Sequence, residues 1–143
     1  MKRIILSSLF IFGVSFLSFS QDITKGTWFN EEKTAKVQFY LKGEKLFGKI
    51  VWLKDPLNKE GNPKLDQFNP DLKSKNNTLI GLVFLKNFEK ISENKWENGK
   101  IYDPNNGKTY SSEMNLVNSK LLNVRGFVGI SLLGRTSKFT KAD

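Results

Sequence analysis

The stretch KVQFYLKGEKLFGKIVWL, residues 36–53, decides the fold class of this chain. Its first seven residues alternate strictly, so that one face carries Val37, Phe39 and Leu41. Alternation with a period of two is typical of a half-buried β-strand. A glycine and a glutamate then form a turn, and KLFGKIVWL returns as a second strand with apolar residues on both faces. Gly48, in the middle of that second strand, predicts a bend, a bulge or a close approach of another segment.

The same period continues along most of the chain, and no helical periodicity persists for the length of a helix after the first twenty residues. Segments of the strand type fall at residues 26–31, 36–42, 45–53, 78–88, 94–102, 108–117, 120–129 and 134–141. About eight short strands separated by tight turns predict an all-β fold, which is an antiparallel meander, a sandwich or a barrel.

The stretch GKIYDPNNGKTYSSEM, residues 99–114, is predicted to be a β-hairpin. Its centre, DPNNG, combines a proline that fixes φ with asparagine and glycine residues that tolerate the left-handed region. A calcium-binding loop is the sharper alternative, because Asp103 and Asn105 have the spacing of its first two ligands. The register then fails at the position that needs glycine. Tyr102 and Tyr110, on the flanking strands, remain candidates to face a cavity with their hydroxyls.

Residues 54–77, KDPLNKEGNPKLDQFNPDLKSKNN, break this strand rhythm. The segment holds three of the four prolines and shows no strand pattern. A structureless connection of this length is uncommon in a compact domain and is usually functional or disordered. We interpret it as a lid or portal over one end of a barrel, and a mobile surface insertion is the alternative.

The first twenty residues have the pattern of a secretory signal peptide. Lys2 and Arg3 precede an apolar run that is too short to span a membrane comfortably, and small residues flank Phe19 before the expected cleavage site. A membrane anchor is the alternative. We therefore expect a signal peptide at 1–20, one mature domain at 21–143 and a periplasmic location, which argues against nucleic-acid partners.

The composition limits the chemistry that this chain can perform, because it contains no histidine and no cysteine. Nucleophilic systems that need those residues and ordinary zinc sites are excluded, and disulfides cannot contribute to stability. Carboxylates remain for a glycan hydrolase, and the candidates are Asp55, Asp66, Asp71, Asp103 and Glu113. No spacing in the sequence pairs any two of them as a glycosidase requires. We therefore expect a protein without enzymatic activity, cofactor or metal.

The charge of the chain is basic, and removal of Lys2 and Arg3 with the leader lowers the formal net charge from +9 to +7. A basic exported protein is suited to contact anionic lipid head groups or acidic cell-wall polymers. The lysines are scattered singly along the chain, so a solvated, soluble surface is the alternative.

The first and last strands carry a pair of residues that resembles the lipocalin-like barrels. The first strand opens with Gly26-Thr27-Trp28, and Arg135 stands near the start of the last strand. In such barrels the first and last strands meet, and the guanidinium lies over the indole. The resemblance implies an antiparallel up-and-down barrel in which Trp28 and Arg135 have a structural role and close one end.

Five stretches cover most of the mature chain in order: GTWFNEE, AKVQFYLKGEKLFGKIVWLKDP, LDQFNPDLKSKNNTLIGLVFLKNF, NGKIYDPNNGKTYSSEMNL and LLNVRGFVGISLLGRTSKFTK. In these stretches the chain resembles bacterial domain-of-unknown-function family 2147. The resemblance implies a small exported protein of Gram-negative bacteria with a lipocalin-like β-barrel, and it supplies no reaction or ligand. The chain departs from the family at residues 73–77, KSKNN, where arginines and a proline are usual, so an arginine fork for a carboxylate or phosphate is not expected there.

These observations together predict a monomeric, non-catalytic binding protein for a small apolar or amphipathic ligand, such as a fatty acid or an envelope lipid. The candidate ligand-binding residues are Trp52, Tyr102, Tyr110 and Arg125. Arg125 lies on the face of its strand opposite Leu122 and Val124, and that face points either to the lumen or to solvent. An envelope interaction protein with a filled barrel is the alternative.

Overall fold

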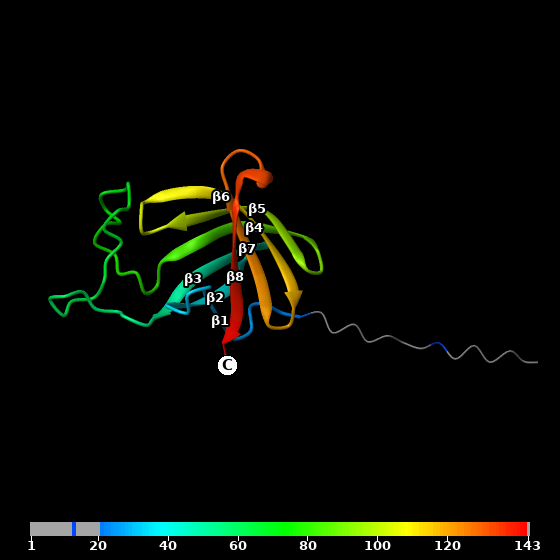
Figure 1. The fold of residues 1–143 in the computed structure, drawn as a ribbon, viewed down its shortest axis with the longest axis horizontal. Coiled ribbons are helices and arrows are strands. Elements are labelled where there is room, and N and C mark those ends of the chain that lie inside the picture. Colours follow the sequence, from blue (N-terminus) through cyan, green and yellow to red (C-terminus); the bar gives the residue numbers. More distant parts are fainter. Residues whose placement is uncertain (1–12, 14–20, 143) are drawn as a thin grey trace, which may run out of the picture.

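The structure is a computed structural model that describes residue 13 and residues 21–142 (Figure 1). Except for Gly13, the predicted signal peptide therefore lies outside the described residues. The described chain forms strands β1 (Thr27–Phe29), β2 (Ala35–Lys42), β3 (Lys45–Leu53), β4 (Val83–Ser92), β5 (Lys95–Asp103), β6 (Lys108–Asn118), β7 (Leu121–Phe127) and β8 (Arg135–Ala142). A short 3₁₀ helix, η1 (Ser131–Leu133), stands between β7 and β8.

Each strand pairs antiparallel with the next one along the chain, and β1 pairs with β8, so that the sheet closes into a barrel (Figure 1). The closing strand β1 has three residues, and they align with the last three residues of β8, with Trp28 opposite Lys141. The predicted all-β, antiparallel up-and-down barrel of about eight strands is therefore confirmed.

One predicted strand begins later than the sequence pattern indicates. The pattern predicts a strand at residues 78–88, whereas β4 begins at Val83. The preceding residues belong to the long connection, where Thr78 forms an isolated bridge with Leu65 and Gly81 has a φ of 96°. Such a positive φ lies outside strand geometry, so regular pairing starts only after this glycine.

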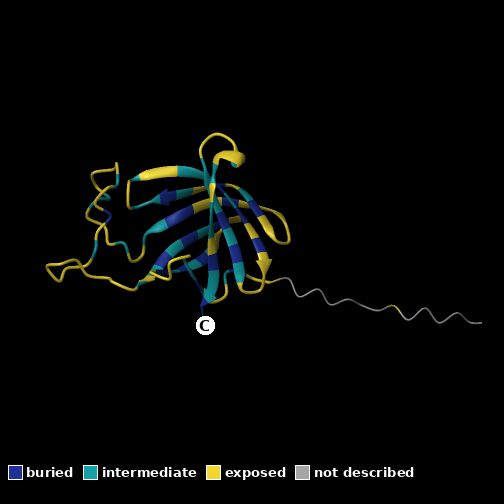
Figure 2. Cartoon of the chain, viewed as in Figure 1, coloured by how far each residue is buried: buried dark blue, intermediate teal, exposed yellow. Residues whose placement is uncertain are grey.

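Large side chains fill one half of the barrel. Those with an exposed fraction of 1% or less include Trp28, Phe39, Leu85, Phe88, Met114 and Leu122. Buried residues alternate with more exposed ones along the strands, as Figure 2 shows. Because the chain has no cysteine, this apolar burial has to supply most of the stability. The barrel is thus a packed core in this half and not a hollow tube.

Two glycines make room for the largest core side chains. A Cβ on Gly48 of β3 would lie 2.9 Å from Leu85 Cδ1, and a Cβ on Gly99 of β5 would overlap the ring of Phe88. The ladders that contain these glycines, β3–β4 and β5–β6, shift register beside them. The close approach that the sequence predicts at Gly48 is therefore confirmed.

The connections that follow the odd-numbered strands emerge at one end of the barrel, which we call the mouth. They comprise residues 30–34, 54–82, 104–107 and 128–134. The opposite end, called the closed end, carries the two-residue turns 43–44, 93–94 and 119–120. Among the described residues, no helix is long and apolar enough to cross a membrane.

The packing of Gly99 against Phe88 gives a first prediction. Gly99→Ala should lower the free energy of unfolding by about 2–3 kcal/mol, because the added methyl group overpacks a ring that cannot move aside. Urea denaturation monitored by circular dichroism measures this loss. Gly126→Ala is the matched control, since its Cβ would meet Ile101 Cγ2 at 3.3 Å, and it should cost less than about 1 kcal/mol. Equal losses in the two variants would contradict the account.

Candidate ligand-binding cavity

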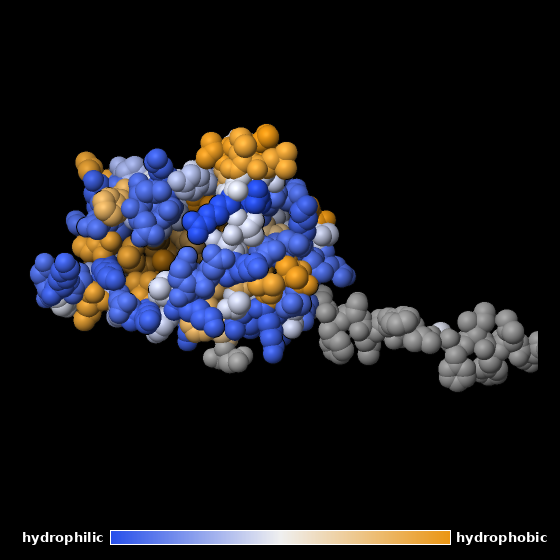
Figure 3. Space-filling view, viewed as in Figure 1, coloured by the Kyte–Doolittle hydropathy of each residue, from blue (hydrophilic) through white to orange (hydrophobic). Residues whose placement is uncertain are grey.

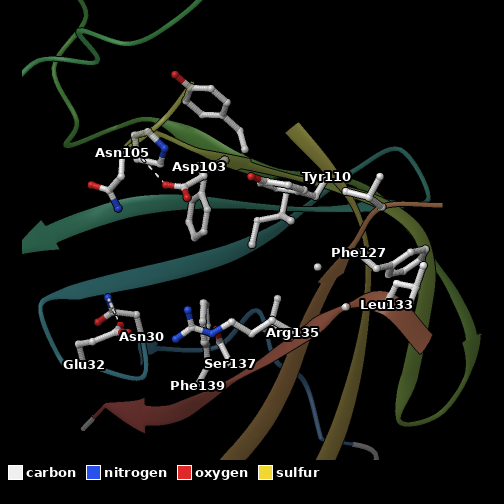
Figure 4. Close-up of a pocket in the computed structure, with 18 residues that line it drawn as sticks. Asn30, Glu32, Asp103, Asn105, Tyr110, Phe127, Leu133, Arg135, Ser137 and Phe139 are labelled. Atoms are coloured by element: carbon white, nitrogen blue, oxygen red, sulfur yellow. Dashed lines mark hydrogen bonds between the residues drawn. The ribbon is translucent and has the colours of Figure 1, made fainter. Parts of the chain in front are cut away.

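A cavity opens at the mouth of the barrel, beyond the packed half (Figure 4). Its volume is about 610 Å³, which lies within the usual range for small-molecule sites in proteins. The apolar part of its lining consists of Phe84, Ile101, Val124, Phe127, Val128, Leu133 and Phe139. These residues come from β4, β5, β7, β8 and the β7–β8 connection, so no single hairpin forms the cavity by itself.

Polar side chains occupy two facing walls of this cavity, as Figure 4 shows. The wall from the β5–β6 hairpin carries Asp103, Asn105 and Tyr110. The opposite wall carries Asn30, Glu32, Arg135 and Ser137. A cavity with an apolar lining and polar groups gathered on its walls suits a molecule that has both an apolar part and a polar part.

Arg135 is the cation that lines this cavity. It points inward because alternation along β8 puts Arg135, Ser137 and Phe139 on the same face. Its partner on β7 is Gly126, which has no side chain and leaves space at this position. No ion pair among the described residues involves Arg135. Its guanidinium therefore has donors available for two parallel hydrogen bonds to a carboxylate or phosphate.

A second hollow of about 360 Å³ adjoins the first at the mouth. The second also reaches Lys64 and Leu79 in the long connection, and the two hollows share Asn30, Phe84, Pro104, Asn105 and Phe139. The long connection thus forms part of the wall at the open end of the barrel. Its function as a lid or portal stays a prediction.

A buried polar contact fixes the long connection to the barrel. The Asp66 carboxylate is 1% exposed, and it accepts hydrogen bonds from the Tyr102 hydroxyl at 2.6 Å and from Asn69 Nδ2 at 2.8 Å. Nearby, the carbonyl of Phe68 packs so closely on Gly107 that no Cβ fits there. Burial and, next, the hydrogen bond to Asp66 raise the pKa of Tyr102 to about 12.

The two predicted tyrosines both border the cavity, but their hydroxyls have different surroundings. Tyr110 lies on the inner wall, and its hydroxyl accepts a hydrogen bond from Asn106 Nδ2 at 3.1 Å (Figure 4). The Tyr102 hydroxyl donates to the buried carboxylate of Asp66 in the long connection. The Tyr110 hydroxyl is therefore the one that a ligand in the cavity can reach.

Trp52 does not line this cavity. It packs edge-to-face against Phe29, with ring centroids 6.2 Å apart, and Lys36 Nζ lies 5.1 Å from its ring. The pairing of β2 with β3 puts Trp52 opposite Lys36, on the outer face of the barrel. The β2–β3 ladder shifts register beside Val37, between this pair and the inner positions of β3. Simple alternation along the sequence does not reveal this shift.

Arg125 also lies on the outer face, because Val124 and Gly126 beside it take inner positions of β7. Its Nε donates to the carbonyl of Ser131 at 2.7 Å, and its Nη1 donates to Thr136 Oγ1 at 2.8 Å. Of the two orientations that the sequence leaves open for Arg125, the structure selects the outer one. The cavity arginine is Arg135 instead.

The expected contact between Trp28 and Arg135 is replaced by another pairing. Lys141 lies opposite Trp28 across the β1–β8 ladder, and its Nζ is 5.0 Å from the centroid of the indole. Arg135 stands six residues earlier on β8, at the mouth, whereas Trp28 lies in the packed half. The cation over the indole is therefore a lysine, and the indole Nε1 donates to the carbonyl of Ile23 at 3.1 Å.

Three of the five candidate carboxylates of a glycan hydrolase lie at separate places, and Asp55 lines the second hollow at the mouth. Asp66 is buried beneath Tyr102, Asp103 lines the cavity, and Glu113 accepts a hydrogen bond from Ser131 Oγ at 2.9 Å on the outer face. Within residues 21–142, no three histidine, cysteine, aspartate or glutamate side chains gather as ligands for a metal ion.

The sequence patterns above did not identify two features of the site, which are Arg135 as the arginine of the cavity and the contact of Asp66 with Tyr102. The parity of β8 carries a signal for Arg135, because it stands four residues before the apolar Phe139 and so shares its face. The pairing of Asp66 with Tyr102 joins residues 36 positions apart and leaves no local signal.

An eight-stranded up-and-down barrel with a cavity at one end is the architecture of the lipocalin-like class. Among solved structures, the chain is similar to one described as "Protein HP1028 from the human pathogen Helicobacter pylori belongs to the lipocalin family". The TM-score is 0.76 at 21% sequence identity, over 86% of this chain and 84% of that chain, and at this identity the likeness shows the fold. Residues 26–141 match the family described as "Uncharacterized protein conserved in bacteria (DUF2147)", and the chain belongs to this family. No curated protein matches the chain.

The contact between Tyr102 and Asp66 gives a second prediction. Tyr102→Phe should lower the free energy of unfolding by about 1–3 kcal/mol, because a buried carboxylate loses one of its hydrogen bonds. Tyr110→Phe is the matched control, and its loss should be about 0.5 kcal/mol or less, because the hydrogen bond that it removes is exposed. Chemical denaturation measures both changes, and a Tyr102→Phe variant as stable as the parent would refute the role of this contact.

The raised pKa of Tyr102 gives a third prediction, on alkaline stability. In the unfolded chain a tyrosine loses its proton near pH 10, whereas folded Tyr102 keeps it until about pH 12. The unfolded state then binds fewer protons than the folded state, so the free energy of unfolding should fall as the pH rises from 10 to 12. Ultraviolet titration of the phenols should show a step near pH 12 that Tyr102→Phe removes. A titration unchanged by Tyr102→Phe would contradict the assignment.

Proposed function

We propose that this protein is a non-catalytic binding protein for a small amphipathic ligand, a fatty acid or an envelope lipid, which it holds in the cavity at the mouth. The observation that carries the proposal is a cavity of about 610 Å³ with a mixed apolar and polar lining and one arginine on its wall. The apolar part of the ligand packs against residues such as Phe84, Val124 and Phe139. The packed half of the barrel below limits how deeply a chain can enter.

The polar head of the ligand meets groups of both signs. Arg135 binds a carboxylate or phosphate, and Tyr110, which lines the same cavity, adds a hydrogen bond from its hydroxyl (Figure 4). Glu32 and Asp103 also line the cavity and accept hydrogen bonds from hydroxyl or ammonium groups. A lysophospholipid head, which has both a phosphate and donor groups, therefore matches the walls better than a bare carboxylate does.

The proposed place of action is the periplasm. A leader with a basic start, an apolar run and small residues at its end supports export. Free fatty acids and lysophospholipids are products of membrane lipids, so an exported binding protein meets them in the cell envelope. Mass spectrometry of the natively purified protein tests whether it carries a bound lipid.

Ligand binding gives a fourth prediction, which concerns Arg135. The affinity for a fluorescent fatty acid should fall about tenfold or more in Arg135→Gln, because a charge-assisted hydrogen bond to the head is lost. Lys138→Gln is the matched control: it removes the same charge from the same strand, at a position outside the lining of either mouth cavity. Fluorescence titration measures both affinities.

The same titration separates the proposed ligands from one another. Unlabelled lysophosphatidylethanolamine should displace the probe more strongly than a fatty acid of equal chain length. An affinity that Arg135→Gln leaves unchanged refutes the assigned head-group site. Absence of both a copurified lipid and any binding of the probe refutes the proposed function.

A further inference from the structure

The β7–β8 connection exposes a compact group of aliphatic side chains. Its members are Val128, Ile130, Leu132 and Leu133, with exposed fractions of 67%, 59%, 85% and 74%, and we call them the apolar tip. Figure 3 shows them as a cap of hydrophobic atoms that projects from the body of the protein at the top of the view. Four exposed aliphatic side chains within six residues make a contiguous patch, and such patches mark interaction sites.

The apolar tip is held in place by polar contacts at its base. Arg125 Nε donates to the carbonyl of Ser131, and Ser131 Oγ donates to Glu113 Oε1. Arg125 also bonds Thr136 at the start of β8, so one guanidinium ties both sides of the connection together. None of the residues of η1 is buried. The connection thus has a defined shape while its apolar side chains face solvent.

The apolar tip is also continuous with the cavity. Val128 and Leu133 belong to the tip and line the cavity at the same time. A surface that covers the tip therefore lies against the mouth of the barrel. This continuity favours an apolar partner that extends across the mouth over a partner that touches the tip alone.

The charges around the tip indicate what that partner is. Arg125 and Arg135 stand at the base of the tip, on either side of it in the sequence, and the carboxylate of Glu113 stands there with them. The base therefore carries more positive than negative charge, and the chain after residue 20 has a formal net charge of +7. Exposed aliphatic side chains above basic ones match a bilayer that contains anionic lipid, since the former enter the acyl boundary and the latter meet phosphates.

We propose that the apolar tip docks this protein onto an anionic lipid bilayer, with the mouth of the barrel against the membrane. The docking rests on the tip and the charges beside it, so it is independent of whether the cavity takes a lipid. The aliphatic residues enter the interface, and the basic residues at their base bind the head groups. Burial of apolar area sets how strongly the tip inserts, and the positive charges set the preference for anionic lipid.

A label at the tip tests the contact directly, because the chain has no natural cysteine. Leu132→Cys and Leu41→Cys give two mature proteins, each with one environment-sensitive fluorophore. Leu41 is 62% exposed and lies next to a turn of the closed end, so it is the matched control. With phosphatidylcholine vesicles that contain phosphatidylglycerol, the label at residue 132 should shift to the blue, and the label at 41 should not. Equal shifts, or none at 132, overturn the proposal.

Removal of the aliphatic side chains tests their contribution. Leu132→Ser should lower the partition coefficient onto the same anionic vesicles about tenfold, and Leu41→Ser should leave it unchanged. Both side chains are exposed, so neither change removes core packing. Sedimentation with vesicles measures the partition, and circular dichroism checks the fold. A partition coefficient that Leu132→Ser does not change overturns the proposal.

Two further outcomes distinguish other occupants of the tip. Partition should be much weaker onto vesicles of pure phosphatidylcholine, and it should fall with added salt, because part of the attraction is electrostatic. Light scattering of the protein without vesicles measures self-association. A dimer that Leu132→Ser disrupts, together with no binding to anionic vesicles, assigns the tip to a second copy of this chain and overturns the membrane contact.

Discussion

The pairing of β1 with β8 is the contact on which the rest of the structure depends. β1 has three residues, and its pairing with β8 is supported by the contact of Lys141 Nζ with the indole of Trp28. The same indole donates a hydrogen bond to the carbonyl of Ile23. Lys141 Nζ also donates to the carbonyl of Lys25, so the segment before β1 is tied to the last strand. This closure also brings Asn30 and Glu32, which follow β1, into the same cavity wall as Arg135 of β8.

The size of the inward side chains divides the barrel into two halves. Near the closed end the inner positions of β4 to β7 hold residues such as Phe88, Met114 and Leu122, which leave no space. Near the mouth, the facing inner positions of β7 and β8 are Gly126 and Arg135, with Ser137 next along β8. Small residues there leave a hollow, and a single cation is directed into it. The packed half therefore supplies stability, and the half at the mouth has room for a ligand.

Two of the connections at the mouth, the long connection and the β7–β8 connection, are fixed to the barrel in different ways. The long connection is fixed by the buried carboxylate of Asp66 beneath Tyr102, so an internal polar contact sets its position. The β7–β8 connection is fixed from outside by Arg125, and its aliphatic side chains remain in solvent. In both connections, hydrogen bonds from polar side chains fix the position of the loop. Arg125 is engaged in this way, and Arg135 is the cation on the cavity wall. Arg125 thus holds the tip of the proposed membrane contact, whereas Arg135 stands both at the base of that tip and on the wall of the proposed ligand site.

The sequence by itself determined the strands, their order and the tight hairpins, because alternation with a period of two and turn residues such as those at 104–107 act over a few positions. It also determined which chemistry is absent, since a chain without histidine or cysteine cannot build the corresponding sites. Parity along β8 carries a signal that Arg135 shares the face of Phe139, but only the tertiary structure decided that Trp52 and Arg125 point outward. The register shift beside Val37 and the contact of Asp66 with Tyr102 likewise depend on pairing between distant segments, for which local patterns carry no information.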